Sequence, residues 1–235
     1  MPYTAVLLDL DGTLLDTIPD LADATNAMLA DLGLAQLSQE TVASLVGKGT
    51  KALIASVLAR QGKSGDQTLL QERAQALFRQ HYHRFNGQRA VLYAGVEQGL
   101  RAFARMGLKL AVVTNKPTEF TLPLLERSGL APYFECVVCG DTCPEQKPQP
   151  APLLHACAQL GAAPGQAVMI GDSINDAQAA QAAGIAALAV PYGYNHGQDV
   201  QNLKVDDIVM SIEAAAQWIS KRRTGQGQTA LLGSA

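Results

Sequence analysis

The sequence predicts an α/β fold: a Rossmann-like parallel sheet with helices on both faces and a small all-helical domain inserted into it. Short apolar runs alternate with helical patterns along most of the chain, which is typical of a parallel sheet built from β-α-β units. The interval between the first two predicted strands, residues 11 to 107, holds 97 residues, whereas a crossover needs roughly a dozen. The excess is expected to form the inserted domain.

Five short apolar runs are expected to form the strands of this sheet. Each is rich in Val, Leu, Ile, Ala or Cys and is bounded by glycine or by polar residues. Right-handed crossovers between the strands would place helices on both faces of the sheet. The expected strands are residues 4–10, 108–114, 135–139, 167–171 and 185–190.

Helical patterns lie between these strands. Each has a glycine at or just after its last residue, and glycine commonly ends a helix. The helices expected in the core are residues 95–106, 117–129, 150–160 and 174–183.

The inserted helical domain is expected to comprise residues 15–87, and the core residues 1–14 and 88–222. Because the insertion begins directly after the first strand, it can act as a lid on a site there. Residues 223–235 are rich in Gly, Gln and Ser, and are predicted to be disordered. Apolar residues at helical spacing predict the helices of the insertion at residues 19–32, 38–46, 50–61 and 66–86.

Composition and charge exclude several classes of protein. Hydrophobic residues make up 48% of the chain and charged residues 17%, with a net charge of −3, which favours a globular protein with a substantial core. The first basic block is Lys221 to Arg223, so no nucleic-acid surface is expected. No apolar run approaches the roughly 20 residues of a membrane span, and the N-terminus lacks the features of a signal peptide. We expect a cytoplasmic protein, as a monomer or homodimer, that binds neither nucleic acid nor membrane.

Three of the four cysteines, Cys136, Cys139 and Cys143, are close in sequence. This spacing is compatible with a zinc site or a redox switch. The first two lie on a predicted strand, however, where residues three apart point to opposite faces. Free thiols are therefore expected, and a metal or redox role for the cluster stays open.

Polar residues follow several of the predicted strands at their carboxyl ends. Ligands bind at this edge of open α/β sheets, so we expect these side chains to share one pocket. Lys147, in the loop after the third strand, is the cation expected there. The other residues predicted for the pocket are Asp9, Asp11, Thr114, Asn115, Asp172 and Asp176.

Four aspartates and one lysine leave an excess of negative charge, which a divalent cation would cancel. Ligands that are all oxygen, with no His or Cys, favour a hard ion, and Mg²⁺ is the natural choice. A metal and a lysine together attract a group rich in anionic oxygen, such as a phosphoryl group. The sequence therefore predicts a small phosphorylated metabolite as the binding partner.

The segments "DLDGTLLDT", "VVTNK", "KPQP" and "GDSIND" resemble, in order, the four motifs of the haloacid dehalogenase superfamily. The resemblance extends to about residue 222, and the insertion at 15–87 looks like the small cap of that superfamily. The segments "DGTLLDTIPDLADATNAMLADLGL" and "TNKP" resemble, more narrowly, its phosphoglycolate phosphatases. The activity that this implies is hydrolysis of 2-phosphoglycolate to glycolate and phosphate.

The resemblance also implies a role for each core residue. Asp9 would attack phosphorus and form an aspartyl-phosphate. Asp11 would protonate the leaving alkoxide and then activate water. Thr114 and Lys147 would hold phosphoryl oxygens.

Three residues are implied as ligands of Mg²⁺. They are Asp9 and Asp172 through their carboxylates and Asp11 through its backbone carbonyl. Asp176 would orient the site without touching the metal.

The loop "VGKGT" between two helices of the insertion is the candidate for recognising the leaving group. Gly47 and Gly49 would let the backbone approach the substrate, while Lys48 meets a carboxylate; Asn115 is also expected to bind substrate. A plain turn with a surface lysine is the alternative for this loop.

Other activities stay open for this site. They are hydrolysis of another small sugar phosphate or organic-acid phosphate, and a phosphonoacetaldehyde-type hydrolysis with Lys48 or Lys51 as a Schiff base. A non-catalytic binding module is disfavoured because every motif position is filled.

Overall fold

The computed structural model describes residues 3–62, 68–195 and 199–231, with side chains up to residue 223. A six-stranded sheet lies at its centre, in the order β5-β4-β1-β6-β7-β8, and all neighbouring strands are parallel. Its strands are β1 (Ala5–Leu8), β4 (Lys109–Val113), β5 (Cys136–Val138), β6 (Ala167–Gly171), β7 (Ala186–Ala189) and β8 (Asp207–Ile208).

The sheet confirms the predicted α/β fold class and its five predicted strands. The central strand β1 is an unbroken buried apolar run, as expected of a strand covered on both faces. Three short strands were not predicted: β8 at the edge, and the antiparallel pair β2 (Leu15–Asp16) and β3 (Val91–Leu92). Each has two residues, too few to show an alternating pattern.

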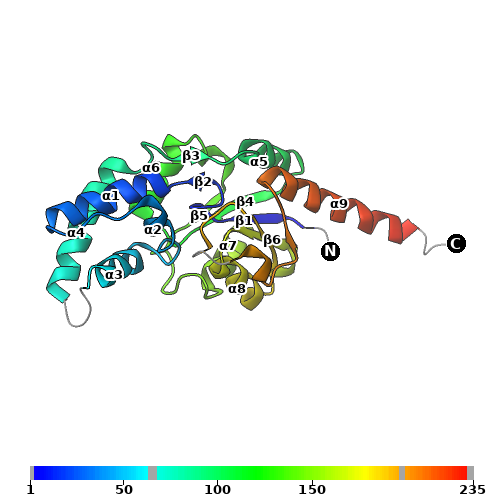
Figure 1. The fold of residues 1–235 in the computed structure, drawn as a ribbon. Coiled ribbons are helices and arrows are strands. Elements are labelled where there is room, and N and C mark those ends of the chain that lie inside the picture. Colours follow the sequence, from blue (N-terminus) through cyan, green and yellow to red (C-terminus); the bar gives the residue numbers. More distant parts are fainter. Residues whose placement is uncertain (1–2, 63–67, 196–198, 232–235) are drawn as a thin grey trace.

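Helices cover both faces of the sheet, because side chains alternate between the faces along each strand. Val6 and Leu8 of β1 share a cluster with residues of α5, α6 and α9, whereas Ala5 and Leu7 share one with residues of α7 and α8. Figure 1 shows these layers. The helices are α5 (Val96–Arg105), α6 (Thr118–Arg127), α7 (Ala151–Leu160), α8 (Ile174–Ala183) and α9 (Ile212–Leu231).

Four further α-helices form a separate group beside one end of the sheet, which we call the helical unit (Figure 1). They pack around an apolar cluster of their own, to which α6 of the core contributes Phe120. The helix expected over 38–46 is shorter than predicted and ends at Ala43. The helical unit consists of α1 (Ile18–Asp31), α2 (Gln39–Ala43), α3 (Thr50–Arg60) and α4 (Thr68–Phe85).

Asp20, in the first turn of α1, ties together the two chain segments that join the helical unit to the core. Its buried carboxylate accepts backbone N–H groups of Gly87 at 2.8 Å, Arg89 at 2.8 Å and Ala90 at 3.2 Å. These residues lie in the segment that returns from α4 to the core. One charged side chain therefore fixes the returning segment against the outgoing one.

The C-terminal helix α9 continues to Leu231, beyond the boundary at residue 222 that the sequence predicts. Residues 223–231, which the sequence predicts to be disordered, belong to this helix. No proline interrupts this stretch, and its glycines weaken a helix without stopping it. The rest of the predicted tail, residues 232–235, lies outside the described residues.

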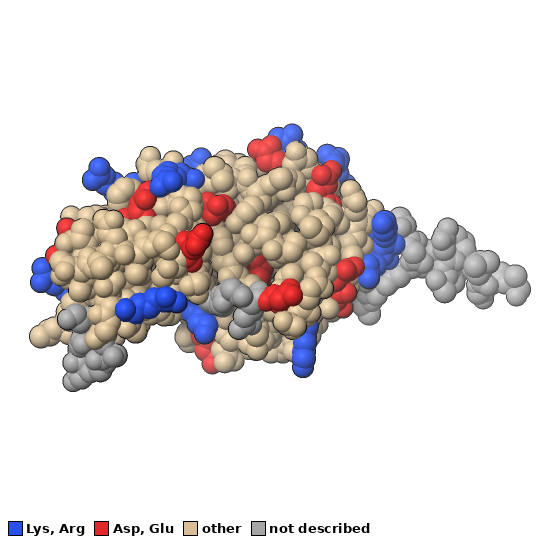
Figure 2. Space-filling view, viewed as in Figure 1, with Lys and Arg blue, Asp and Glu red and all other residues tan. Residues whose placement is uncertain are grey.

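The surface carries charges of both signs. Figure 2 shows basic and acidic side chains scattered over this face of the molecule, in keeping with the small net charge of −3. Within the described part of the chain, no helix combines the length and apolar character needed to span a membrane. The four cysteines are free thiols.

Candidate active site

A small cavity lies where the carboxyl ends of the central strands meet the helical unit. Its volume is about 50 Å³, and its wall includes Asp9 and Asp11 after β1 and Tyr82 from α4. Of the residues predicted for the site, all but Lys48 and Asp176 line this cavity. Side chains from distant parts of the sequence converge here because parallel strands end at the same edge of the sheet.

Gly12 and Gly193 allow two backbone segments to approach Asp172 closely. The φ angle of Gly12 is +88°, and a Cβ atom there would lie 2.4 Å from Asp172 Oδ2. A Cβ atom on Gly193 would lie 2.2 Å from the same oxygen. Asp172 Oδ2 accepts the backbone N–H of Tyr194 at 2.6 Å. The carboxylate of Asp172 is thus held against the loop after β1.

The ammonium group of Lys147 joins two carboxylates in the buried part of the site. Nζ donates to Asp9 Oδ1 at 2.8 Å, to Asp176 Oδ1 at 2.6 Å and to the carbonyl of Val113 at 2.6 Å. Burial opposes its charge, but Asp176 and Asp9 outweigh burial and raise the pKa of Lys147 above its usual value. Lys147 is therefore a fixed cation whose three N–H groups are all in use.

Asp176 positions Lys147 from behind the cavity. Its Oδ1 accepts from Lys147, and its Oδ2 accepts the backbone N–H of Ser173 at 3.1 Å and the Ser173 hydroxyl at 2.8 Å. This second pair of bonds caps the first turn of α8. With both oxygens engaged, Asp176 is suited to orienting the site.

Asp9, Asp172 and Asp176 each bring one carboxylate oxygen to within 4.8 Å of the others. Burial, with repulsion from Asp176 and Asp11, raises the pKa of Asp9 to about 7 although Lys147 opposes the shift. Burial and the charges of Asp9 and Asp176 hold the pKa of Asp172 well above its usual range. The cluster thus carries more negative charge than Lys147 balances.

A divalent cation fits this donor set. The ligand atoms are all carboxylate oxygens, which hard ions prefer, and a cation would relieve the repulsion that raises the two pKa values. Asp9 and Asp172 are the carboxylates best placed to hold it, because Asp176 is engaged by Lys147 and Ser173.

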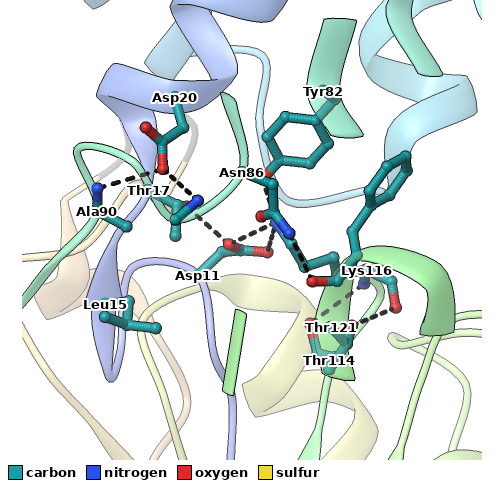
Figure 3. A network of polar contacts seen from close by, with 12 residues as sticks. Asp11, Leu15, Thr17, Asp20, Tyr82, Asn86, Ala90, Thr114, Lys116 and Thr121 are labelled. Carbon is teal, nitrogen blue, oxygen red and sulfur yellow. Dashed lines mark hydrogen bonds and ion pairs between the residues drawn. The ribbon is translucent and has the colours of Figure 1, made fainter. Parts of the chain in front are cut away.

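Asp11 lies in a second polar network, drawn in Figure 3. Its Oδ1 accepts the hydroxyl of Thr17 at 2.6 Å and the ammonium of Lys116 at 3.0 Å. Lys116 Nζ also donates to the hydroxyl of Tyr82 from α4 and lies 4.7 Å from the centre of the Tyr82 ring. Burial opposes the charge of Lys116, but Asp11 and Tyr82 outweigh it and raise its pKa above the usual value.

Lys116 was missed as a site residue, since only Lys147 was expected as a cation here. A lysine just after a strand is usually solvated, but the Lys116 side chain is 3% exposed. Its neighbour Thr114 is also buried, and the Thr114 hydroxyl accepts the backbone N–H of Lys116 at 3.1 Å. The hydroxyl of Thr114 can therefore still donate to a bound oxygen.

The loop between α2 and α3 is joined to the core through the backbone of Gly47. The carbonyl oxygen of Gly47 accepts the side-chain amides of Asn115 and Asn175, each at 3.1 Å. Gly47 has a φ of +126° and Gly49 a φ of +80°, and such angles favour glycine. The two glycines bring the backbone to the cavity wall, as the sequence predicts.

The structure does not bring Lys48 to the cavity, where the sequence places it. The Lys48 side chain is exposed and does not line the cavity, because the loop turns its backbone inward. Asn115, expected to bind substrate, lines the cavity. Its side-chain amide also joins two loops, since it donates to the Lys147 carbonyl at 2.9 Å and its oxygen accepts the Lys147 N–H at 3.0 Å.

Comparisons with known proteins agree over most of the chain. Residues 6–190 match the family described as haloacid dehalogenase-like hydrolase. A phosphoglycolate phosphatase of Thiobacillus denitrificans is 45% identical over 221 residues, covering 94% of this chain and 97% of that protein. The phosphoglycolate phosphatase of Nitrosospira multiformis is 47% identical over 221 residues, with the same coverage of 94% and 97%.

A solved structure shares the whole architecture. The crystal structure of a predicted phosphoglycolate phosphatase from Haemophilus somnus superposes with a TM-score of 0.87 at 32% identity, covering 92% of this chain and 97% of that one. The sequence match, the fold and the acidic site at the carboxyl ends of the strands together show that the chain belongs to the haloacid dehalogenase-like hydrolase family.

Proposed function

We propose that this phosphoric monoester hydrolase uses Mg²⁺ and hydrolyses 2-phosphoglycolate to glycolate and phosphate through an aspartyl-phosphate. The observation that carries the proposal is one cavity that holds Asp9, fixed by Lys147, and a second carboxylate, Asp11, beside it. The names of the relatives at 45% and 47% identity support the choice of substrate.

In the first half of the reaction, Asp9 is the nucleophile. Lys147 holds its Oδ1, and the other carboxylate oxygen attacks phosphorus. The bond between phosphorus and the ester oxygen breaks, and Asp11, carrying a proton, donates it to that oxygen so that glycolate leaves as an alcohol. The hydroxyl of Thr114 can donate to a phosphoryl oxygen during this step, and Lys147, whose N–H groups are engaged, stabilises the phosphoryl oxygens through its positive charge.

In the second half, Asp11 acts as a base. It takes a proton from a water molecule, whose oxygen attacks phosphorus and breaks the bond to Asp9. Phosphate is released and both carboxylates return to their starting states. The carboxylates of Asp9 and Asp172 and the carbonyl of Asp11 would hold Mg²⁺, which when bound neutralises charge on the phosphoryl oxygens.

We further propose that residues 15–87 are a cap on a core of residues 1–14 and 88–222. The cap closes the cavity with residues such as Tyr82 and Gly47 and limits the access of water.

A Schiff-base mechanism with a lysine of the cap finds no support in this geometry. Lys48 and Lys51 are exposed and do not line the cavity. Among the described residues of the cavity wall, the lysines are Lys116 and Lys147, and both belong to the proposed core.

A screen of small phosphate monoesters with Mg²⁺ and with EDTA tests the proposal. We expect the highest kcat/KM for 2-phosphoglycolate, and loss of turnover in EDTA that added Mg²⁺ restores. Asp9→Asn should reduce kcat by several orders of magnitude, since an amide cannot form the phosphoenzyme. Unchanged activity after exhaustive EDTA treatment, or full activity of Asp9→Asn, would contradict the mechanism; a higher kcat/KM on a sugar phosphate would contradict the substrate.

A further inference from the structure

We propose that Lys116 binds the carboxylate of the leaving group and so selects substrates that carry an acid next to the ester. This inference rests on the proposed function and assigns the recognition of the acid to a residue of the core. It replaces Lys48, which the sequence favoured for this role and which lies outside the cavity wall.

Lys116 is the cation of the cavity wall that still has a donor to offer. Lys147 uses its three N–H groups on Asp9, Asp176 and the Val113 carbonyl. The contacts of Lys116 Nζ with described residues are those to Asp11 and to the Tyr82 hydroxyl. Two of its three hydrogen bonds, at 3.0 Å and 3.3 Å, go to the two oxygens of the same Asp11 carboxylate, and a single N–H group can serve both. An ammonium has three N–H groups, so with one on Asp11 and one on Tyr82 the third can turn to a ligand, whereas the three groups on Lys147 go to three separate partners.

The position of Lys116 matches the chemistry of the leaving group. Asp11 is the residue that protonates the ester oxygen, and Lys116 Nζ lies 3.0 Å from its carboxylate. In 2-phosphoglycolate one methylene group separates the ester oxygen from the acid. A substrate whose ester oxygen faces Asp11 therefore places its carboxylate beside that oxygen, within reach of Lys116.

Tyr82 fixes the ammonium at this place. Its hydroxyl accepts from Nζ, and its ring, packed between Phe78 and Phe120, forms the wall against which Lys116 rests. The Lys116 side chain is 3% exposed, so its charge is poorly screened by solvent and its contact with an anion is strong. A site built around such a donor discriminates against a substrate that lacks the acceptor.

The test compares two esters in matched variants. We expect Lys116→Met to lower kcat/KM for 2-phosphoglycolate about 10- to 100-fold more than for ethyl phosphate, which has no carboxylate. Lys204→Met is the control, because Lys204 is exposed and does not line the cavity, and it should leave both values unchanged. If Lys116 only orients Asp11, both esters will lose activity by the same factor, which overturns the inference.

Two further variants keep the test valid if Lys116→Met folds poorly. Lys116→Arg retains the charge and should keep part of the preference for 2-phosphoglycolate. Tyr82→Phe retains the ring but loses the hydroxyl, and should lower the preference by less than Lys116→Met. Lys48→Met provides the contrary outcome. If it lowers kcat/KM for 2-phosphoglycolate selectively, while the three variants at Lys116 and Tyr82 keep the wild-type preference for that substrate, the assignment to Lys116 is overturned.

The proposed function can fail separately from this inference. If the wild-type enzyme does not prefer 2-phosphoglycolate to ethyl phosphate, the proposed substrate is wrong and the inference falls with it. If the wild type shows the preference and Lys116→Met retains it, only the assignment to Lys116 is wrong.

Discussion

When no cation is bound, the stability of the folded protein should fall as the pH rises through the acidic range. Burial raises the pKa of Asp9 to about 7 and holds that of Asp172 well above its usual range, whereas in an unfolded chain both titrate near about 3.9. The metal-free folded state therefore binds these protons more tightly than the unfolded state. The stability that they contribute is fully present below about pH 4 and is lost as the pH rises to about 7.

The size of the effect follows from the shift at Asp9. Each pKa unit corresponds to about 1.4 kcal/mol, so titration of Asp9 between pH 5 and pH 7 should lower the free energy of unfolding by about 2 kcal/mol. For a protein of this size, that loss lowers Tm by roughly 4–8 °C. The Asp172 carboxyl changes stability in the same direction.

Thermal unfolding in EDTA at pH 5, 6 and 7 measures this loss. Asp9→Asn is the control, because an amide does not titrate, so its Tm should fall by less over the same range. Mg²⁺ should raise the Tm of the wild type more at pH 7 than at pH 5, since protons compete with the cation for the same oxygens. Parallel curves for the wild type and Asp9→Asn, or a wild-type Tm that rises with pH in EDTA, would refute the reasoning.

Two further variants test other parts of the structure. Asp11→Ala should lower the steady-state turnover of 2-phosphoglycolate by a factor of about 10²–10⁴. The leaving group of p-nitrophenyl phosphate needs no acid, so with that substrate the variant should still show a pre-steady-state burst. The absence of a burst would count against the role of Asp11. Asp20→Ala should lower the free energy of unfolding, measured by urea titration, by about 2–3 kcal/mol. The variant removes the charged acceptor of the N–H groups of Gly87, Arg89 and Ala90. A change below about 0.5 kcal/mol would show that these hydrogen bonds contribute little to stability.

The sequence predicts the core of the site well because strand ends are local signals. Asp9, Asp172 and Lys147 each follow a strand of the sheet, and a parallel sheet brings such positions together. Lys116 is different, because its burial depends on Tyr82 and Asp11, which are 34 and 105 residues away in the sequence. Pairings at that range are set by packing between elements and leave no pattern in a short window of sequence.

For Lys48, the sequence predicts the position of the loop but not the direction of the side chain. The glycines on either side of it predict a loop that approaches the ligand, and the loop does line the cavity. The side-chain amides of Asn115 and Asn175 hold the carbonyl of Gly47 toward the core, and the side chain of Lys48 is exposed. The strand β8 was not predicted because two residues are too few to show an alternating pattern. The end of α9 was not predicted because its glycine-rich sequence resembles that of an irregular segment.

The attachment of the α2–α3 loop through a peptide oxygen has an evolutionary consequence. Every amino acid carries the same carbonyl, so the bonds from Asn115 and Asn175 do not depend on which side chains the loop bears. At position 47 the φ of +126° favours glycine, but neighbours such as Lys48 and Thr50 are free of that restriction. Thr50 lines the cavity, so descendants of this enzyme can change the shape offered to a new substrate while the loop keeps its hold on the core.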